Sequence, residues 1–198
     1  MDNRVSATLA WFHLTRENLL TPNPDPALAF QGFSIQTGEQ RSQGIELDVT
    51  ASLMTGWNVI ASYAYTDAEV TQDNDPSLLN KRLANVPYNK LTFWSTYFFQ
   101  EGALKGFGVG GGIFAFSNRN ASLFGNQNEI PGYVRADAAL YYNHDLRPDN
   151  WLRAKTLFAA VNMRNLLDQR YVATSQNGSQ FFLFGEPRTV LATVGLQF

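Results

Sequence analysis

The last ten residues of the chain alternate between apolar and more polar positions. One face of this segment would carry only apolar side chains, namely Val190, Ala192, Val194, Leu196 and Phe198. The other face would carry a more polar set, namely Thr189, Leu191, Thr193, Gly195 and Gln197. Since successive side chains of a strand point to opposite faces, the pattern predicts a strand with lipid on one side and water on the other.

The same alternation recurs along the chain. In segment 45–53 the apolar residues take the odd positions, and both carboxylates, Glu46 and Asp48, take even ones. Similar segments lie at 4–11, 57–66 and 133–142, and Ile60 is the one exception within 57–66. Weaker copies lie at 88–99, 105–117 and 155–165. We count about eight segments, each near or above the roughly 9 to 11 residues that a tilted strand needs to cross a bilayer. The predicted fold class is therefore all-β, an antiparallel transmembrane β-barrel wall.

The pattern also predicts which side chains share a face. The lumen side should carry Glu46, Asp48, Asn58, Arg135 and Asp137, and the lipid side Leu47, Val49, Val59, Ala136, Val194 and Leu196. Aromatic residues, 14% of the chain, fall into two groups that predict girdles at the two membrane interfaces. One group contains Trp11, Phe12, Tyr63, Tyr65, Phe114, Phe116 and Tyr171, and the other Trp57, Tyr97, Phe99, Tyr142, Trp151 and Phe198.

The gaps between the segments alternate in length. Long gaps at 15–41, 72–87, 118–131 and 173–186 are predicted outer loops, and the shorter gaps at 54–56, 100–104 and 143–154 are predicted periplasmic turns. This orientation places Phe198 on the periplasmic side. A mean hydropathy of −0.22, with no run of about 18 apolar residues, does not fit helical membrane spans.

Composition argues against several other classes of function. The chain has no cysteine, and its two histidines, His13 and His144, are far apart, so no metal site is expected. A net charge of −2 argues against nucleic acid as a partner.

Three motifs have ordinary structural explanations. The stretch Gly106–Gly111 has the spacing of a dinucleotide site, but strand-like sequence follows it instead of a helix. Asp73–Asp75 lacks the residues that would complete a calcium loop. A possible catalytic group has no Ser-His-Asp arrangement beside it and is expected to be lumen-facing charge; it comprises Glu46, Asp48, Arg135 and Asp137.

Several short signatures occur in one order and point to a family. They are Gly38–Leu47, Ala61–Val70, Asn85–Pro87, Ile130–Val134, Asn165–Tyr171, Gly185–Thr189 and the terminal strand. Together they resemble TonB-dependent siderophore receptors, above all the ferrichrome and hydroxamate group. The resemblance covers residues 1–198 and corresponds to the last eight or so strands of a barrel with about 22.

The resemblance implies a location in the bacterial outer membrane and a function in ferric siderophore uptake. It implies no cofactor, since the ferric siderophore is the transported ligand. The TonB complex would act through an amino-terminal plug that residues 1–198 do not contain, and Phe198 would be the signal read by the barrel-assembly machinery. No secretory signal precedes the first strand, so we expect the chain to be the carboxyl-terminal piece of a longer protein.

The aromatic run Phe181–Phe184 suggests where a ligand would bind. Exposed aromatic side chains above the membrane are unfavourable unless they fold inward or meet a partner. In hydroxamate receptors such rings help to form the pocket, so the ligand-binding candidates are Phe182, Phe184, Phe124, Arg119 and Tyr171. The alternative is that these rings pack the loop against its neighbours.

Two rival functions stay open at this stage. The chain could be a self-contained small barrel of about eight strands that serves as an anchor or narrow pore, with a lumen filled by side chains. It could also be a barrel enzyme, although no nucleophile and base lie in suitable register, and we therefore expect no enzyme activity.

Overall fold

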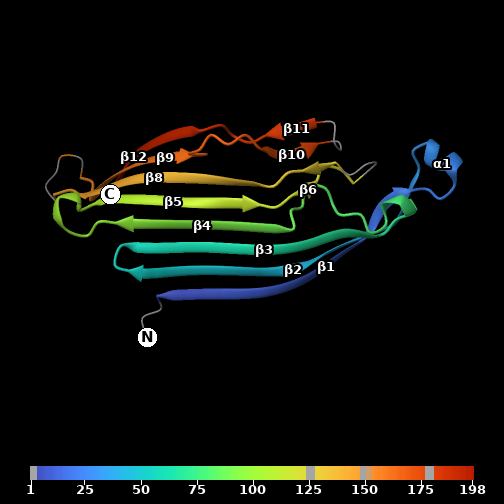
Figure 1. Cartoon of the computed structure of the whole chain (residues 1–198), viewed down its shortest axis with the longest axis horizontal. Coiled ribbons are helices and arrows are strands. Elements are labelled where there is room, and N and C mark those ends of the chain that lie inside the picture. Colours follow the sequence, from blue (N-terminus) through green and yellow to red (C-terminus); the bar gives the residue numbers. More distant parts are fainter. Residues whose placement is uncertain (1–3, 124–127, 148–150, 152, 177–180) are drawn as a thin grey trace.

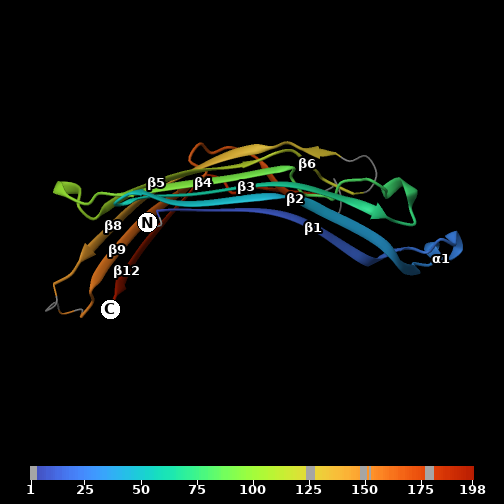
Figure 2. The ribbon, with the colours of Figure 1, turned by 90° about the horizontal axis from the view of Figure 1, so that it is seen from below.

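The computed structural model describes residues 4–123, 128–147, 151, 153–176 and 181–198. Eight strands form one antiparallel sheet in the order β1 (Val5–Pro22), β2 (Ser34–Met54), β3 (Trp57–Gln72), β4 (Asn89–Phe98), β5 (Phe107–Phe116), β8 (Tyr133–Asp145), β9 (Thr156–Arg164) and β12 (Thr189–Gln197). Figure 1 shows these strands side by side, and Figure 2 shows that the sheet is a single curved layer. The predicted all-β antiparallel wall is confirmed.

The remaining elements lie in the connections. The outer loops hold two small two-stranded sheets, one of β6 (Arg119–Asn120) with β7 (Glu129–Ile130) and one of β10 (Val172–Gln176) with β11 (Phe181–Phe184). The short helices are α1 (Pro26–Phe30), η1 (Pro76–Leu78) and η2 (Gly102–Leu104). In the described ranges, no helix has the length and apolar character needed to span a membrane.

The strand register gives the sheet two chemically different faces. Residues directly opposite one another in paired strands share a face. One row across six strands is Leu9, Leu47, Tyr63, Leu91, Ala115 and Val134, and the adjacent row is Thr8, Asp48, Ser62, Thr92, Phe114 and Arg135. The strand register therefore confirms the predicted division of the residues between two faces. We call the face with Asp48 the concave face and the face with Leu47 the convex face.

The convex face is apolar and uncovered. Leu9 is 74% exposed and Val194 73% exposed, because a single-layer sheet has no second layer to bury these side chains. Apolar surface of this extent is stable only against an apolar environment. Compact packing occurs instead at the outer end, where loops cover the sheet and bury Val70, Leu78 and Ile130.

The predicted aromatic girdles are right for some residues and wrong for others. Register places Trp11 and Tyr65 on the convex face at the outer end, and Trp57 opposite Tyr97 on that face at the other end. Phe12, Phe114 and Phe116, however, lie on the concave face, opposite Gly44, Arg135 and Tyr133 respectively.

Glycines explain how large rings fit on the concave face. Gly112 lies opposite Trp94, and a Cβ there would come within 2.5 Å of Cε3 of that ring. Gly195 lies opposite Phe158, and a Cβ there would come within 2.2 Å of Cζ. In β5 and β12, glycines thus make room for the aromatic side chains of neighbouring strands.

The first predicted outer loop is wrong in extent. β1 and β2 remain paired from Val5 to Pro22, so the segment between the two strands is only 23–33 and not 15–41. Above Trp11 the convex face becomes polar, with Thr15, Arg41 and Glu69 in one row. Both faces of the hairpin meet water there, so the sequence has no alternation from which a strand could be predicted.

Candidate ligand-binding site

Three outer loops meet at the outer end of the concave face. Tyr171 follows β9 and stacks on Tyr133, the first residue of β8, with ring centroids 4.0 Å apart and planes at 21°. Phe116 of β5 stacks on the same Tyr133 ring at 4.9 Å. We call these three rings the aromatic platform. Stacked rings of this kind bury apolar area in a fixed geometry, so the platform gives this end of the wall a defined surface.

An ion pair with a buried carboxylate lies next to the platform. Nη2 of Arg135 donates to Oδ2 of Asp137 at 2.9 Å, and Nη1 of Arg135 lies 3.5 Å from the hydroxyl of Tyr171. Asp137 is 8% exposed, and its Oδ1 accepts a hydrogen bond from the backbone N–H of Asn165 at 2.8 Å. Both oxygens of Asp137 are therefore bonded by protein groups, while Nε of Arg135 is buried without a partner among the described residues, and the pair acts as a structural support.

The turn after β9 fixes the position of Tyr171. Asn165 has a φ of 52°, in the left-handed region that asparagine tolerates, and it is 1% exposed. Its Nδ2 donates to the carbonyl oxygens of Gln169 and Glu186, each at 2.9 Å, and its Oδ1 accepts from the N–H of Gln169. The signature Asn165–Tyr171 is thus a locked turn that presents its last residue to the platform.

The other wall of the site comes from the segment before β12. The N–H of Gly185 donates to the carbonyl of Tyr171 at 2.8 Å. A Cβ at Gly185 would come within 2.0 Å of Cζ of the Tyr171 ring. This glycine is therefore the residue that allows the ring to lie against the backbone.

Arg119 is buried, and it anchors the β10–β11 hairpin. It is 5% exposed, and its Nη2 donates to the carbonyl oxygens of Val172 at 2.7 Å and Ala173 at 2.8 Å. Burial lowers the pKa of Arg119 from its usual value. Because its guanidinium bonds to the backbone of β10, Arg119 supports the strand pair that carries Phe182 and Phe184.

The remaining sequence candidates divide between described and undescribed residues. Phe182 and Phe184 lie on β11 and are 40% and 76% exposed. Phe124 lies outside the described residues. The structure thus brings Arg119, Tyr171 and β11 to one place.

Two adjoining cavities open at this place. One of about 370 Å³ is lined by Asp168, Gln169, Arg170, Tyr171, Phe184, Gly185 and Pro187. The other, of about 190 Å³, is lined by Pro131, Gly132, Tyr133, Gln169, Arg170, Tyr171, Val172 and Phe184. Tyr171 and Phe184 line both cavities, so an aromatic ligand surface with a few polar groups is available here.

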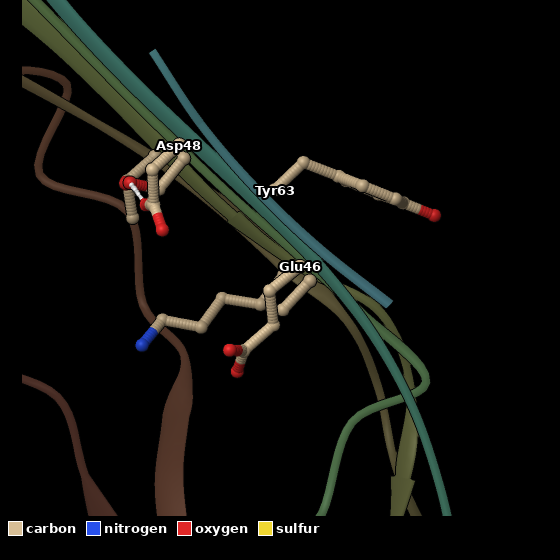
Figure 3. A pocket seen from close by; sticks show the side chains of 7 residues that line it. Glu46, Asp48 and Tyr63 are labelled. Atoms are coloured by element: carbon tan, nitrogen blue, oxygen red, sulfur yellow. Dashed lines mark hydrogen bonds between the residues drawn. The ribbon is translucent and has the colours of Figure 1, made fainter. Parts of the chain in front are cut away.

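A further cavity lies on strands β2, β3 and β4. A pocket of about 300 Å³ is lined by Glu46, Asp48, Ser62, Tyr63, Ala64, Lys90 and Thr92. Figure 3 shows Glu46 and Asp48 on the side toward which the sheet curves, and Tyr63 on the opposite side. Asp48 accepts a hydrogen bond from the hydroxyl of Ser62. Glu46 and Asp48 therefore belong to the water-facing lining of the concave face. No cluster of acidic or histidine side chains in the described ranges has metal-binding geometry.

Sequence reasoning missed two residues that connect the outer loops, Asn85 and Ser175. The side chain of Asn85 bonds to both backbone groups of Ser175, which is 6% exposed. The sequence singles out Asn85 only as part of the signature Asn85–Pro87 and as a turn residue, and neither predicts a distant partner.

Comparison with known proteins identifies the family. The sequence model described as "TonB dependent receptor-like, beta-barrel" matches residues 1–166. The metal-pseudopaline receptor CntO of Pseudomonas aeruginosa (strain UCBPP-PA14) is 32% identical over 198 residues, which are 100% of this chain and 26% of that receptor. The ferrichrome outer membrane transporter/phage receptor of Escherichia coli (strain K12) is also 32% identical, over 100% of this chain and 25% of that protein.

A solved structure agrees with the sequence matches. The ferric-catecholate import receptor Fiu of Escherichia coli K12, in its closed form, superposes with a TM-score of 0.75 at 28% identity, over 100% of this chain and 26% of that one. The chain thus spans about a quarter of the length of the relatives it matches. It belongs to the family of TonB-dependent receptor-like β-barrels, which are bacterial outer-membrane proteins and not enzymes.

Proposed function

We propose that residues 1–198 form the carboxyl-terminal part of the barrel of a TonB-dependent receptor that takes up a ferric siderophore. The observation that carries this proposal is a curved, one-layer sheet with a polar concave face, an apolar convex face and two unpaired edges. In the described structure β1 pairs only with β2, and β12 only with β9. Unpaired strand edges are strongly unfavourable in lipid, so both edges need partner strands from the rest of a larger barrel.

The rival small barrel receives no support from this arrangement. A self-contained barrel would pair β1 with β12, and the sheet in this structure stays open between them. Closing it with eight strands would leave a lumen just wide enough to be filled by side chains. The rings on the concave face would then occupy the space that a ligand needs.

A ferric hydroxamate of the ferrichrome type is the substrate class that we propose. Such chelates are neutral and present a weakly polar surface, which suits Phe182, Phe184 and Tyr171 as contacts. Of the three guanidinium groups at the site, Arg119 turns to β10 and Arg135 to Asp137, whereas Arg170 lines both cavities. An anionic catecholate chelate would have only Arg170 to pair with unless it displaced one of these pairings.

The proposal includes partners that lie beyond these residues. Energy would come from the TonB complex acting on a plug contributed by another part of the receptor. Outer-membrane lipid would cover the convex face, and the barrel-assembly machinery would read the strand that ends at Phe198.

Uptake by the full-length receptor tests the proposal. The receptor is produced in a strain without its own siderophore receptors, and iron supplied as ferrichrome, iron supplied as a catecholate, and a metal–pseudopaline complex are compared, each with and without TonB. We expect TonB-dependent uptake of ferrichrome. Uptake of the catecholate or of the pseudopaline complex without uptake of ferrichrome would overturn the substrate class. Uptake that does not depend on TonB would overturn the mechanism.

A single substitution tests the ligand surface. Phe184→Ala should raise the half-saturating ferrichrome concentration about tenfold, which corresponds to about 1.4 kcal/mol of binding free energy. Phe30→Ala is the matched control, because Phe30 is 95% exposed in the first outer loop, away from the aromatic platform. Equal effects of the two substitutions would contradict a ligand role for Phe184.

A further inference from the structure

The β10–β11 hairpin is separate from the main sheet. β10 pairs with β11 from Val172 opposite Phe184 to Gln176 opposite Phe181, and in the described structure the two strands form a sheet of their own. The described hydrogen bonds that connect the centre of β10 to the other outer loops involve side chains. The position of Phe182 and Phe184 therefore depends on a small number of side-chain contacts.

Asn85 provides two of these contacts in the manner of a neighbouring strand. Its Oδ1 accepts from the N–H of Ser175 at 2.9 Å, and its Nδ2 donates to the carbonyl oxygen of Ser175 at 3.1 Å. The hydroxyl of Ser175 also lies 3.1 Å from Oδ1 of Asn85 and donates to the carbonyl of Ala121. A primary amide can make both backbone contacts at once because it carries a donor and an acceptor.

The backbone of Asn85 completes a connection among three loops. Its N–H donates to the carbonyl oxygen of Asn120 at 2.8 Å, and its φ is 63°. Among residues with a side chain, asparagine is one of the few that adopt this left-handed conformation readily. Asn85 thus combines a turn conformation with an amide that reaches a residue 90 positions away.

We propose that Asn85 is a positioning residue that holds the far end of the β10–β11 hairpin, and with it Phe182, at the ligand site. Arg119 is the second anchor, since it holds the start of β10 through Val172 and Ala173. Loss of Asn85 should therefore loosen the far end of the hairpin while its start stays attached. The link to ligand affinity rests on the proposed function, whereas the link to hairpin order does not.

Spin labelling of the full-length receptor in outer membranes tests hairpin order. The chain contains no cysteine, so a nitroxide can be attached at Leu183→Cys on β11, with any cysteine elsewhere in the receptor replaced by serine. Asn85→Gly keeps the left-handed backbone and removes the amide. Asn80→Gly is the matched control, because Asn80 lies in the same loop with a φ of 60° and its N–H bonds to Val70 and not to β10.

The expected result is a mobile spectral component in Asn85→Gly and a spectrum unchanged from the parent in Asn80→Gly. Asn85→Asp should also loosen the hairpin, because a carboxylate cannot donate to the carbonyl of Ser175. In uptake assays Asn85→Gly should raise the half-saturating ferrichrome concentration at least threefold and leave the maximal rate unchanged.

Three outcomes would count against specific parts of the account. An immobile label in Asn85→Gly would overturn the positioning role. A mobile label with unchanged half-saturation would overturn its connection to ligand binding. Absence of uptake by the parent receptor would overturn the proposed function, while the spectra would still decide whether Asn85 holds the hairpin.

Discussion

Gly185 is the residue on which the aromatic platform most directly depends. An added Cβ would lie 2.0 Å from Cζ of Tyr171, so Gly185→Ala must displace the ring from Tyr133. We expect a loss of about 1–3 kcal/mol in the free energy of unfolding, as for other overpacked sites. Urea unfolding of the full-length receptor measures this loss.

Gly111→Ala is the control for that substitution. The nearest atom to a Cβ at Gly111 is 3.9 Å away, which is ordinary van der Waals distance. This variant should unfold within about 0.5 kcal/mol of the parent, as is usual for substitutions that disturb no packing. A loss at Gly111 as large as that at Gly185 would show that the Tyr171 contact is not the cause.

At the scale of single residues, only chemistry that shows in a local pattern could be used for prediction from sequence. Tyr171 and Phe184 were candidates because aromatic residues stood in a predicted outer loop, and both line the cavities there. The role of Asn85 could not be predicted, because it depends on a contact with Ser175 across 90 positions. Arg119 was a candidate as a hydrogen-bond donor, but its backbone contacts with β10 could not be predicted from its type.

Among the elements, β2 gives the sharpest test of the two faces. Val49 lies on the convex face, in the row with Ala7, Ala61 and Phe93, and Thr50 on the concave face. Val49→Lys should cost about 2–4 kcal/mol, the usual cost of lysine at the bilayer midplane, and Thr50→Lys should cost little because its side chain meets water. The measurement is the free energy of unfolding into urea from lipid bilayers, and equal losses would contradict the assigned faces.

The end of β12 carries a separate prediction about assembly. Phe198 follows the strand and is 69% exposed, so it contributes little to packing within this chain. Its deletion from the full-length receptor should reduce the heat-modifiable, membrane-inserted fraction severalfold while total expression stays constant. Phe30→Ala should leave that fraction unchanged. An undiminished inserted fraction after deletion of Phe198 would remove its role as an assembly signal.

Element-scale prediction worked within the membrane and failed above it. In 45–53 the contrast between lipid and water imposes strict alternation, and the predicted faces match the register. The upper parts of β1 and β2 meet water on both sides, so their sequence resembles a loop although they remain paired as far as Pro22 and Ser34. The inward turn of Phe12 was also missed, since it depends on the cross-strand partner Gly44.

At the scale of the whole molecule, the proposed function makes the chain one wall segment of a larger barrel. Its relatives are about four times as long, and both edges of its sheet are open. The missing partner strands would close the lumen, and a plug would connect that lumen to the TonB complex. The aromatic platform would then face the ligand from one side of a complete receptor.

The most direct test compares these 198 residues with the full-length receptor. Each is exported to the outer membrane of a receptor-deficient strain, and uptake of labelled ferric hydroxamate is followed with and without TonB. The account predicts TonB-dependent uptake by the full-length receptor and none by the 198-residue chain. TonB-dependent uptake by the 198-residue chain alone would contradict it.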